Sequence, residues 1–308
     1  MATELPRWLE APRRRASTAL RANRLPHALL VQGPPGWGQA ALARALALEM
    51  LERDRADAPA DIAELAHPDL RWVLPEGKGE QIRIDAIRAL AEFASQTPQI
   101  APCKVAVLVP ADALNEHAAN ALLKTLEEPP GSTYLLLVTE APADLLPTIR
   151  SRCQRLDVVS APRADVLAWV GQRAPEAKAS LIDELGFELG FAPFPLAHAA
   201  RDGSPTIRAV LDEAIGGASP IPLAEKLGTL PLDDVLSRSM RYLADALAHG
   251  LAGAPPRLQL RLDPEATGRA VELWTWHGDA RAAVVQGSYP NPRLVLERLL
   301  YGWRALAA

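Results

Sequence analysis

A glycine-rich stretch at residues 33–40, GPPGWGQA, constrains the fold of this chain more than any other feature. The apolar run before it, ALLVQ at residues 28–32, predicts a short buried strand. The stretch after it, residues 41–51, is rich in Ala and Leu at helical spacing. A strand, a glycine-rich turn and a helix in this order form the context of a phosphate-binding loop, because backbone N–H groups and the helix N-terminus then face the anion. The sequence therefore predicts the scaffold of a nucleotide-binding site.

The side chains that handle a nucleotide are missing from this scaffold. The functional pattern is G-x-x-x-x-G-K-[ST]; Gly33 and Gly38 occupy its glycine positions, with Gly36 between them. Gln39 stands where a lysine would contact the outer phosphates, and Ala40 stands where a hydroxyl would bind magnesium. We therefore expect no ATP hydrolysis and no tightly bound ATP, although the backbone amides can still hold a phosphate weakly.

Strand and helix patterns alternate through the first half of the chain. With helices between them, further strands are predicted at residues 70–74, 105–109, 134–138 and 156–159. This alternation is typical of an α/β fold in which helices cover both faces of a mostly parallel sheet. From about residue 161 the strand patterns vanish, and helical stretches alternate with Pro/Gly breaks. The predicted domains are a core at 1–160, a small helical domain at 161–203 and a second helical domain at 204–308.

Composition argues against several classes of protein. The net charge of -4 argues against a protein that binds nucleic acid on its own, which normally carries a basic surface. The two cysteines, Cys103 and Cys153, are too few for a four-cysteine zinc site, so we expect reduced, buried thiols. The N-terminus has no continuous apolar segment of a secretory signal, and no run is long enough to span a bilayer. We expect a cytoplasmic protein without membrane contact.

Two groups of residues outside the glycine-rich stretch have a structural interpretation. Residues 1–26 predict an amphipathic helix packed on the core, and the basic cluster at 13–15 is more typical of a solvated face than of a nucleic-acid site. The aromatic residues near the C-terminus are expected in a helical core or at a subunit interface: Trp274, Trp276, His277 and Trp303.

A cationic segment, residues 148–153, follows the strand predicted at 134–138. We expect this segment at the edge of the sheet where the strands end and ligands bind. Arg152 then has two interpretations. It is an ordinary surface residue, or it is an arginine finger that neutralises charge on a phosphate bound by a neighbouring subunit. The residues alone leave both open.

Five short segments carry a resemblance to a known family. In order they are LPHAL at 25–29, the glycine-rich stretch at 33–40, HPDL at 67–70, NALLKTLEEPP at 120–130 and Ser-Arg-Cys at 151–153. Together they resemble the bacterial clamp-loader subunits of the AAA+ class, for which the last two segments are highly specific. The resemblance covers the first half of the chain, and the second half matches it only in layout.

This resemblance implies a RecA-like AAA+ core at 1–160, a helical lid at 161–203 and, at 204–308, a helical collar through which subunits assemble. The ATP-hydrolysing gamma/tau subunits of the family keep a Lys-Thr and an Asp-Glu pair, whereas Val109 and Pro110 stand at the Asp-Glu positions here. The resemblance therefore implies a subunit that does not hydrolyse ATP. Its Arg152 would reach the ATP of an adjacent gamma/tau subunit, within the family motif that Ser151 and Cys153 complete.

The implied partners are the gamma/tau and delta subunits, the sliding clamp and, through the complex, primer-template DNA. The implied role is to help open the clamp and place it on primed DNA, with no ATPase or polymerase chemistry in this chain itself. The chain would nevertheless belong to the DNA-directed DNA polymerase holoenzyme.

Two departures from the family pattern bear on cofactors. Residues 51–66 lack the four cysteines of the family's zinc module, so we expect no zinc. The arginine that senses nucleotide in active relatives is missing as well, although Arg208 lies near its place.

Two other functions stay open. One is an active AAA+ ATPase similar to gamma/tau, against which Gln39, Ala40, Val109 and Pro110 count. The other is a stand-alone DNA-binding protein, against which the acidic net charge counts.

Overall fold

The computed structural model describes residues 5–52, 67–76, 81–252, 257–258, 260–285, 288 and 291–307. Its contacts divide the chain into two compact units. The N-terminal unit comprises Met1–Trp169 with Ala192–Phe194, and the helical unit comprises Val170–Phe191 with Pro195–Ala308. The domain boundaries expected after residues 160 and 203, and the lid and collar that they define, stay predictions.

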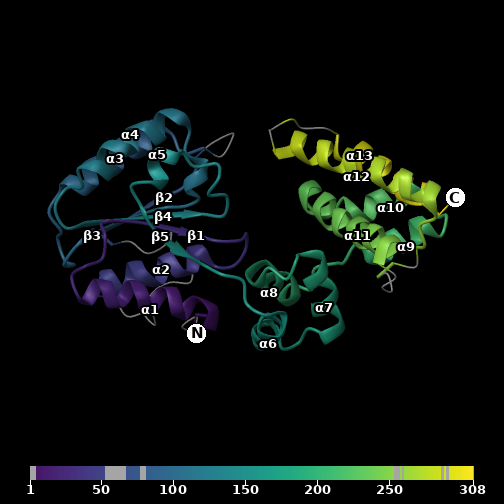
Figure 1. Cartoon of the computed structure of the whole chain (residues 1–308), viewed down its shortest axis with the longest axis horizontal. Helices are drawn as coiled ribbons and strands as arrows, with labels where there is room; N and C mark the ends of the chain where they lie inside the picture. Colours follow the sequence, from purple (N-terminus) through teal and green to yellow (C-terminus); the bar gives the residue numbers. More distant parts are fainter. Residues whose placement is uncertain are drawn as a thin grey trace. The chain divides into compact units, whose positions relative to one another are not determined.

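The N-terminal unit contains a parallel sheet in the order β2-β3-β4-β1-β5. The strands are β1 (Ala28–Gln32), β2 (Leu70–Val73), β3 (Lys104–Leu108), β4 (Thr133–Thr139) and β5 (Gln154–Asp157). Helices α1 (Arg7–Arg21) and α2 (Gln39–Met50) cover one face (Figure 1). Helices α3 (Ile84–Ser95), α4 (Glu116–Glu127) and α5 (Pro147–Arg150) cover the other, and a 3-10 turn occupies Ala111–Ala113 (Figure 1). The predicted α/β core with helices on both faces is confirmed.

The central strands form where apolar side chains pack against helices on the two faces of the sheet. Every residue of β3 is buried, as the apolar run predicted for a central strand. Helix α4 begins where the side chain of Asn115 accepts a hydrogen bond from the N–H of Ala118 at 2.9 Å. The predicted N-terminal helix is confirmed as α1, which packs on α2 and buries Trp8.

A buried ion pair lies where β3 begins. The side chains of Asp69 and Lys104 are both fully buried, with 3.5 Å between Oδ1 and Nζ. Both Asp69 carboxylate oxygens also accept hydrogen bonds, from the N–H groups of residues 99–101 at 2.7 to 2.9 Å. Burial by itself would raise the pKa of Asp69, but these three bonds and the charge of Lys104 outweigh it and lower the pKa to about 2. The HPD segment at 67–69 therefore anchors the loop between α3 and β3.

Replacing Asp69 with Asn is expected to lower the free energy of unfolding by about 2 kcal/mol at pH 7, since the charged carboxylate is what the folded state favours. The folded pKa lies below the unfolded value, so this stability is present above about pH 4 and is lost as the pH falls towards 2. Urea titrations from pH 7 to pH 2.5 measure it. Equal pH dependence in wild type and Asp69→Asn would contradict the assignment.

The helical unit holds the rest of the chain. Two helices begin in the N-terminal unit and end in the helical unit: α6 (Arg163–Arg173) and α8 (Pro193–Arg201). The others lie within the helical unit: α7 (Ala179–Glu188), α9 (Arg208–Ile215), α10 (Pro220–Leu227), α11 (Leu232–Ala252), α12 (Pro264–Val285) and α13 (Pro292–Ala305). Its core is formed mainly by α9 to α13. No helix in the described part of the chain combines the length and the apolar character needed to cross a membrane.

The C-terminal aromatic residues divide between core and surface. Trp303 and His277 are fully buried, Trp276 packs against the core, and Trp274 is 38% exposed. The indole N–H of Trp303 donates to Ser239 Oγ at 2.7 Å, and Ser239 Oγ lies 2.9 Å from His277 Nε2. The expected core role is confirmed for Trp303 and His277, while the subunit interface stays a prediction.

Candidate functional site

The glycine loop, residues 33–40, joins β1 to α2 as predicted. Gly38 ends the loop with a φ of 97°, in the left-handed region that favours glycine. A Cβ at this position would lie 2.3 Å from a ring carbon of Phe194, so the backbone passes directly beneath that ring. The N–H of Phe194 also donates to the carbonyl of Gly36 at 3.2 Å. A residue from far along the chain therefore covers the loop.

The loop's own polar groups bond within the protein. Gln39, in the lysine position, is 1% exposed, and its Nε2 donates to the carbonyl of Pro34 at 2.6 Å. The N–H of Gly36 donates to the carboxylate of Glu140 at 2.8 Å. Glu140 follows the end of β4 and places a negative charge beside the loop. Ala40 is exposed and offers only a methyl group. The negative charge of Glu140 disfavours a second anion beside it.

The end of β3 offers no carboxylate at the expected positions. The strand ends at Leu108, and Val109 and Pro110 follow it, joined by a cis peptide bond. Asp112, in the next turn, accepts a hydrogen bond from the hydroxyl of Thr139. Its carboxylate therefore contacts the end of β4.

An aromatic cluster lies against the loop and was not predicted. Trp8 meets Trp37 and Trp169 edge to face, with ring centroids 5.8 and 5.5 Å apart, and Trp169 lies 5.1 Å from Phe194. The indole N–H of Trp8 donates to the carbonyl of Trp37 at 3.1 Å. The large apolar residue inside the loop, Trp37, was the one signal in the sequence, and its partners could not be identified from spacing.

Arg152 lies at the opposite edge of the sheet from the glycine loop. It precedes β5 by two residues, whereas the loop follows β1, and the register pairs Leu29 with Gln154 and Gln32 with Asp157. We call the two edges the amino edge, where strands begin, and the carboxyl edge, where they end. The expectation that Arg152 lies at the ligand-binding carboxyl edge is wrong. The connection through α5 returns the chain to the amino edge, because the next strand is parallel.

The Ser-Arg-Cys motif has a separate structural task for each side chain. Cys153 is buried in the core, where burial raises its pKa to about 11. Ser151 Oγ donates to the carbonyl of Thr148 at 3.0 Å and accepts from Arg152 Nη1 at 3.4 Å. Arg152, whose side chain is 36% exposed, extends from this anchored turn. Cys103 is likewise buried, and its pKa is also raised by burial to about 11, so the predicted buried thiols are confirmed.

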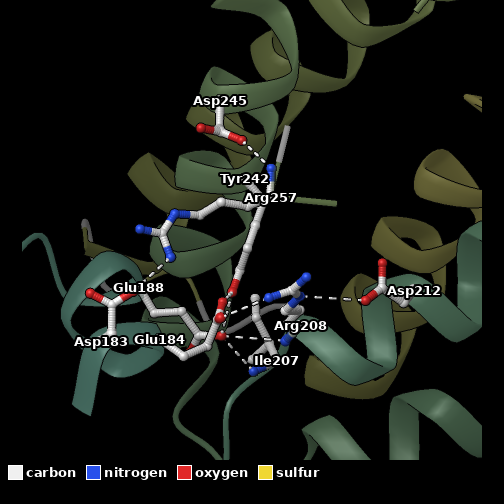
Figure 2. Close-up of polar contacts among 9 residues, drawn as sticks. All are labelled: Asp183, Glu184, Glu188, Ile207, Arg208, Asp212, Tyr242, Asp245 and Arg257. Atoms are coloured by element: carbon white, nitrogen blue, oxygen red, sulfur yellow. Dashed lines mark hydrogen bonds and ion pairs between the residues drawn. The ribbon is translucent and has the colours of Figure 1, made fainter. Parts of the chain in front are cut away.

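Arg208, the candidate nucleotide sensor, contacts carboxylates of its own unit (Figure 2). Its Nη1 lies 2.9 Å from Glu184 Oε2, and its Nε lies 3.6 Å from Asp212. The neighbouring N–H of Ile207 donates to the buried carboxylate of Glu188 at 2.8 Å. These bonds join α7 to the start of α9. The sensor role stays a hypothesis.

No group of three or more potential ligands for a metal ion occurs in the described ranges. Most of the stretch that corresponds to the family's zinc module, residues 53–66, lies outside them. The expectation of no zinc stays a prediction.

Comparisons with known proteins agree in identifying a family. Residues 10–161 match the family described as DNA polymerase III, delta subunit. A DNA polymerase III subunit delta' from Pseudomonas aeruginosa is 33% identical over 302 residues, covering 91% of this chain and 92% of that protein. The subunit delta' of Escherichia coli K12 is 31% identical over 191 residues, covering 59% of this chain and 57% of that protein. A subunit gamma/tau of Mycobacterium tuberculosis is 30% identical over 251 residues, covering 77% of this chain and 42% of that protein.

A solved structure shows the same fold. The DNA polymerase III gamma subunit-related protein of Thermotoga maritima superposes with a TM-score of 0.56 at 18% identity, covering 98% of this chain and 100% of that one. The subunit delta' of Pseudomonas aeruginosa has a higher sequence identity to this chain, 33%, and covers 91% of it. This chain belongs to the family of DNA polymerase III delta' subunits.

Proposed function

We propose that this chain is a subunit of a bacterial sliding-clamp loader that does not hydrolyse ATP itself. It supplies Arg152 in trans to ATP bound by a neighbouring gamma/tau subunit. The proposed partners are the gamma/tau and delta subunits, the clamp and, through the assembled complex, primer-template DNA. The chain's own contribution is to position a cation and to support assembly.

The position of Arg152 is the observation that carries this proposal. Asp157, the β5 residue level with the start of the glycine loop, lies five residues further along the chain than Arg152. At about 3.3 Å per residue this is roughly 16 Å of backbone, too far for its side chain to serve its own loop. Its side chain is partly exposed on the surface of the N-terminal unit, where another chain can present a phosphate.

The chemistry of phosphoryl transfer also supports an arrangement in which one subunit binds ATP and another supplies the arginine. In phosphoryl transfer, charge accumulates on the oxygens of the transferred group, and an arginine from a neighbouring protein can neutralise it. The glycine loop lacks the lysine and the hydroxyl that hold ATP and magnesium, and Glu140 adds a negative charge beside it. ATP therefore has to be held by another subunit.

A titration of the isolated chain with Mg-ATP tests the first half of the proposal. We expect a Kd weaker than about 1 mM, because the loop retains only backbone donors and one of these already binds Glu140. Glu140→Gln, which removes the negative charge and keeps the side-chain length, is expected to raise any residual phosphate binding. Magnesium-dependent binding by the wild-type chain at micromolar ATP would favour the active ATPase instead.

A further inference from the structure

A carboxylate of the same chain already binds the guanidinium of Arg152. Glu127, the last residue of α4, lies at the amino edge beside the Ser-Arg-Cys turn. Its Oε1 accepts from Arg152 Nε at 2.8 Å and lies 2.6 Å from Nη2. The preceding carbonyl, of Leu126, bonds His27 Nε2 at 3.0 Å just before β1, which fixes the end of α4 at this edge.

The remaining donors of the guanidinium are also largely engaged. Nη1 donates to the carbonyl of Thr148 at 3.1 Å and approaches Ser151 Oγ at 3.4 Å. The Nε–Nη2 side, which forms two parallel bonds to a carboxylate or phosphate, is occupied by Glu127. A phosphate that uses this side must first displace the carboxylate.

We propose that Glu127 is a positioning residue for Arg152. In the free subunit, its carboxylate holds the guanidinium at the surface. When the phosphates of a neighbour's nucleotide bind the guanidinium, they displace this carboxylate. This inference rests on the proposed finger role. It adds that the finger is paired before assembly and that exchange of one anion for another is part of engaging the nucleotide.

The exposure of the pair permits such an exchange. The side chains of Glu127 and Arg152 are 50% and 36% exposed, so water screens their attraction. A triphosphate carries several negative charges and can outcompete a single carboxylate for the same donors. Glu127 should therefore weaken engagement of the finger by a modest factor, without preventing it.

Glu128 provides a matched control for a substitution at Glu127. It is the next residue, it is exposed, and among the described residues it has no side-chain hydrogen bond or ion pair. Replacing either glutamate with Gln removes one negative charge at the same end of α4. Only Glu127→Gln also weakens the bond to Arg152.

The test uses the loader reconstituted from this chain with its gamma/tau and delta subunits, and measures kcat and KM for ATP without clamp or DNA. At the one ATP site that Arg152 faces, we expect Glu127→Gln to raise kcat/KM roughly two- to fivefold, which corresponds to the free energy of a half-exposed ion pair, with kcat changed less. The kcat/KM of the whole loader should rise by that site's share. Glu128→Gln should leave both unchanged. Arg152→Ala should abolish the gain, so that the double variant Glu127→Gln/Arg152→Ala matches Arg152→Ala. Loss of a purely structural contact would not raise kcat/KM.

The outcomes separate this inference from the proposed function. If Arg152→Ala lowers turnover but Glu127→Gln leaves kcat/KM unchanged or lowers it in a fully assembled loader, Glu127 does not compete for the finger and the inference fails alone. The same holds if Glu128→Gln reproduces the gain. If Arg152→Ala has no effect on turnover, the finger itself is wrong and the inference fails with it.

Discussion

Replacing Arg152 with Ala is expected to reduce ATP hydrolysis by about 10³-fold at the one site that this residue faces in the assembled loader. The physical reason is that the developing charge on the transferred phosphoryl group loses its cationic partner in a site from which water is largely excluded. Steady-state turnover, stimulated by clamp and primed DNA, should fall at least by the share of that site. Turnover falls further if the sites hydrolyse ATP in an obligatory order.

Arg155→Ala is the matched control for this substitution. Arg155 is an exposed arginine in β5, three residues along the chain, and has no side-chain partner among the described residues. The substitution Arg155→Ala removes the same charge from the same unit, so a loader that contains it should hydrolyse ATP as fast as wild type. Size-exclusion chromatography should show complete assembly with either variant. Equal losses in both would indicate a general effect of charge and not a finger.

Replacing Trp303 with Ala is expected to lower the free energy of unfolding by about 4 kcal/mol, the largest stability loss predicted for this chain. The side chain is fully buried in the core of the helical unit. The substitution leaves a cavity and deprives Ser239 Oγ of the indole N–H that now donates to it. Trp303→Phe keeps most of the volume and should cost about 1 to 2 kcal/mol.

Trp274→Ala measures the cost of losing an indole from the surface of the same unit. Trp274 is 38% exposed, and we expect its loss to lower the free energy of unfolding by less than about 1 kcal/mol. Denaturant unfolding followed by circular dichroism compares the three variants. A loss for Trp303→Ala no larger than that for Trp274→Ala would contradict the assignment of Trp303 to the core.

The core of the fold was predictable where a strand is buried on both faces. β1, β3 and β4 were each located to within one residue at either end, because a continuous apolar run has no other place in an α/β protein. β5 was predicted two residues too late. It is an edge strand with exposed Gln154, Arg155 and Asp157, so its polar residues hid the strand pattern.

The missing nucleotide-binding side chains of the candidate site could be predicted from the sequence, but the contacts of its loop could not. Gln39 and Ala40 could be recognised as substitutions because the glycines around them fix the loop. Phe194 could not be placed over that loop, since more than 150 residues separate it from Gly38 and no periodicity connects them. Lys104 was missed for a related reason. A charged residue at the start of a buried strand becomes understandable only once Asp69 is found beside it.

The position of Arg152 in the sequence did not show whether it lies at the amino edge or at the carboxyl edge of the sheet. The prediction followed the end of β4 and did not include the return through α5, a helix of four residues. A helix this short gives almost no sequence signal, yet the connection that contains it leads from the carboxyl edge to the amino edge, where the Ser-Arg-Cys motif lies. Arg152 and the chain's own glycine loop lie at opposite edges, a placement that supports the proposed role in trans.

Rapid-quench measurement of a single turnover tests the central claim most directly. A loader preloaded with radiolabelled ATP, containing wild-type chain or Arg152→Ala, is mixed with clamp and primed DNA, and bound and hydrolysed ATP are counted. We predict the same amount of bound ATP and the loss of one site's share of the rapid hydrolysis phase. A rapid phase of unchanged rate and amplitude in Arg152→Ala would show that this arginine does not act on a neighbour's ATP.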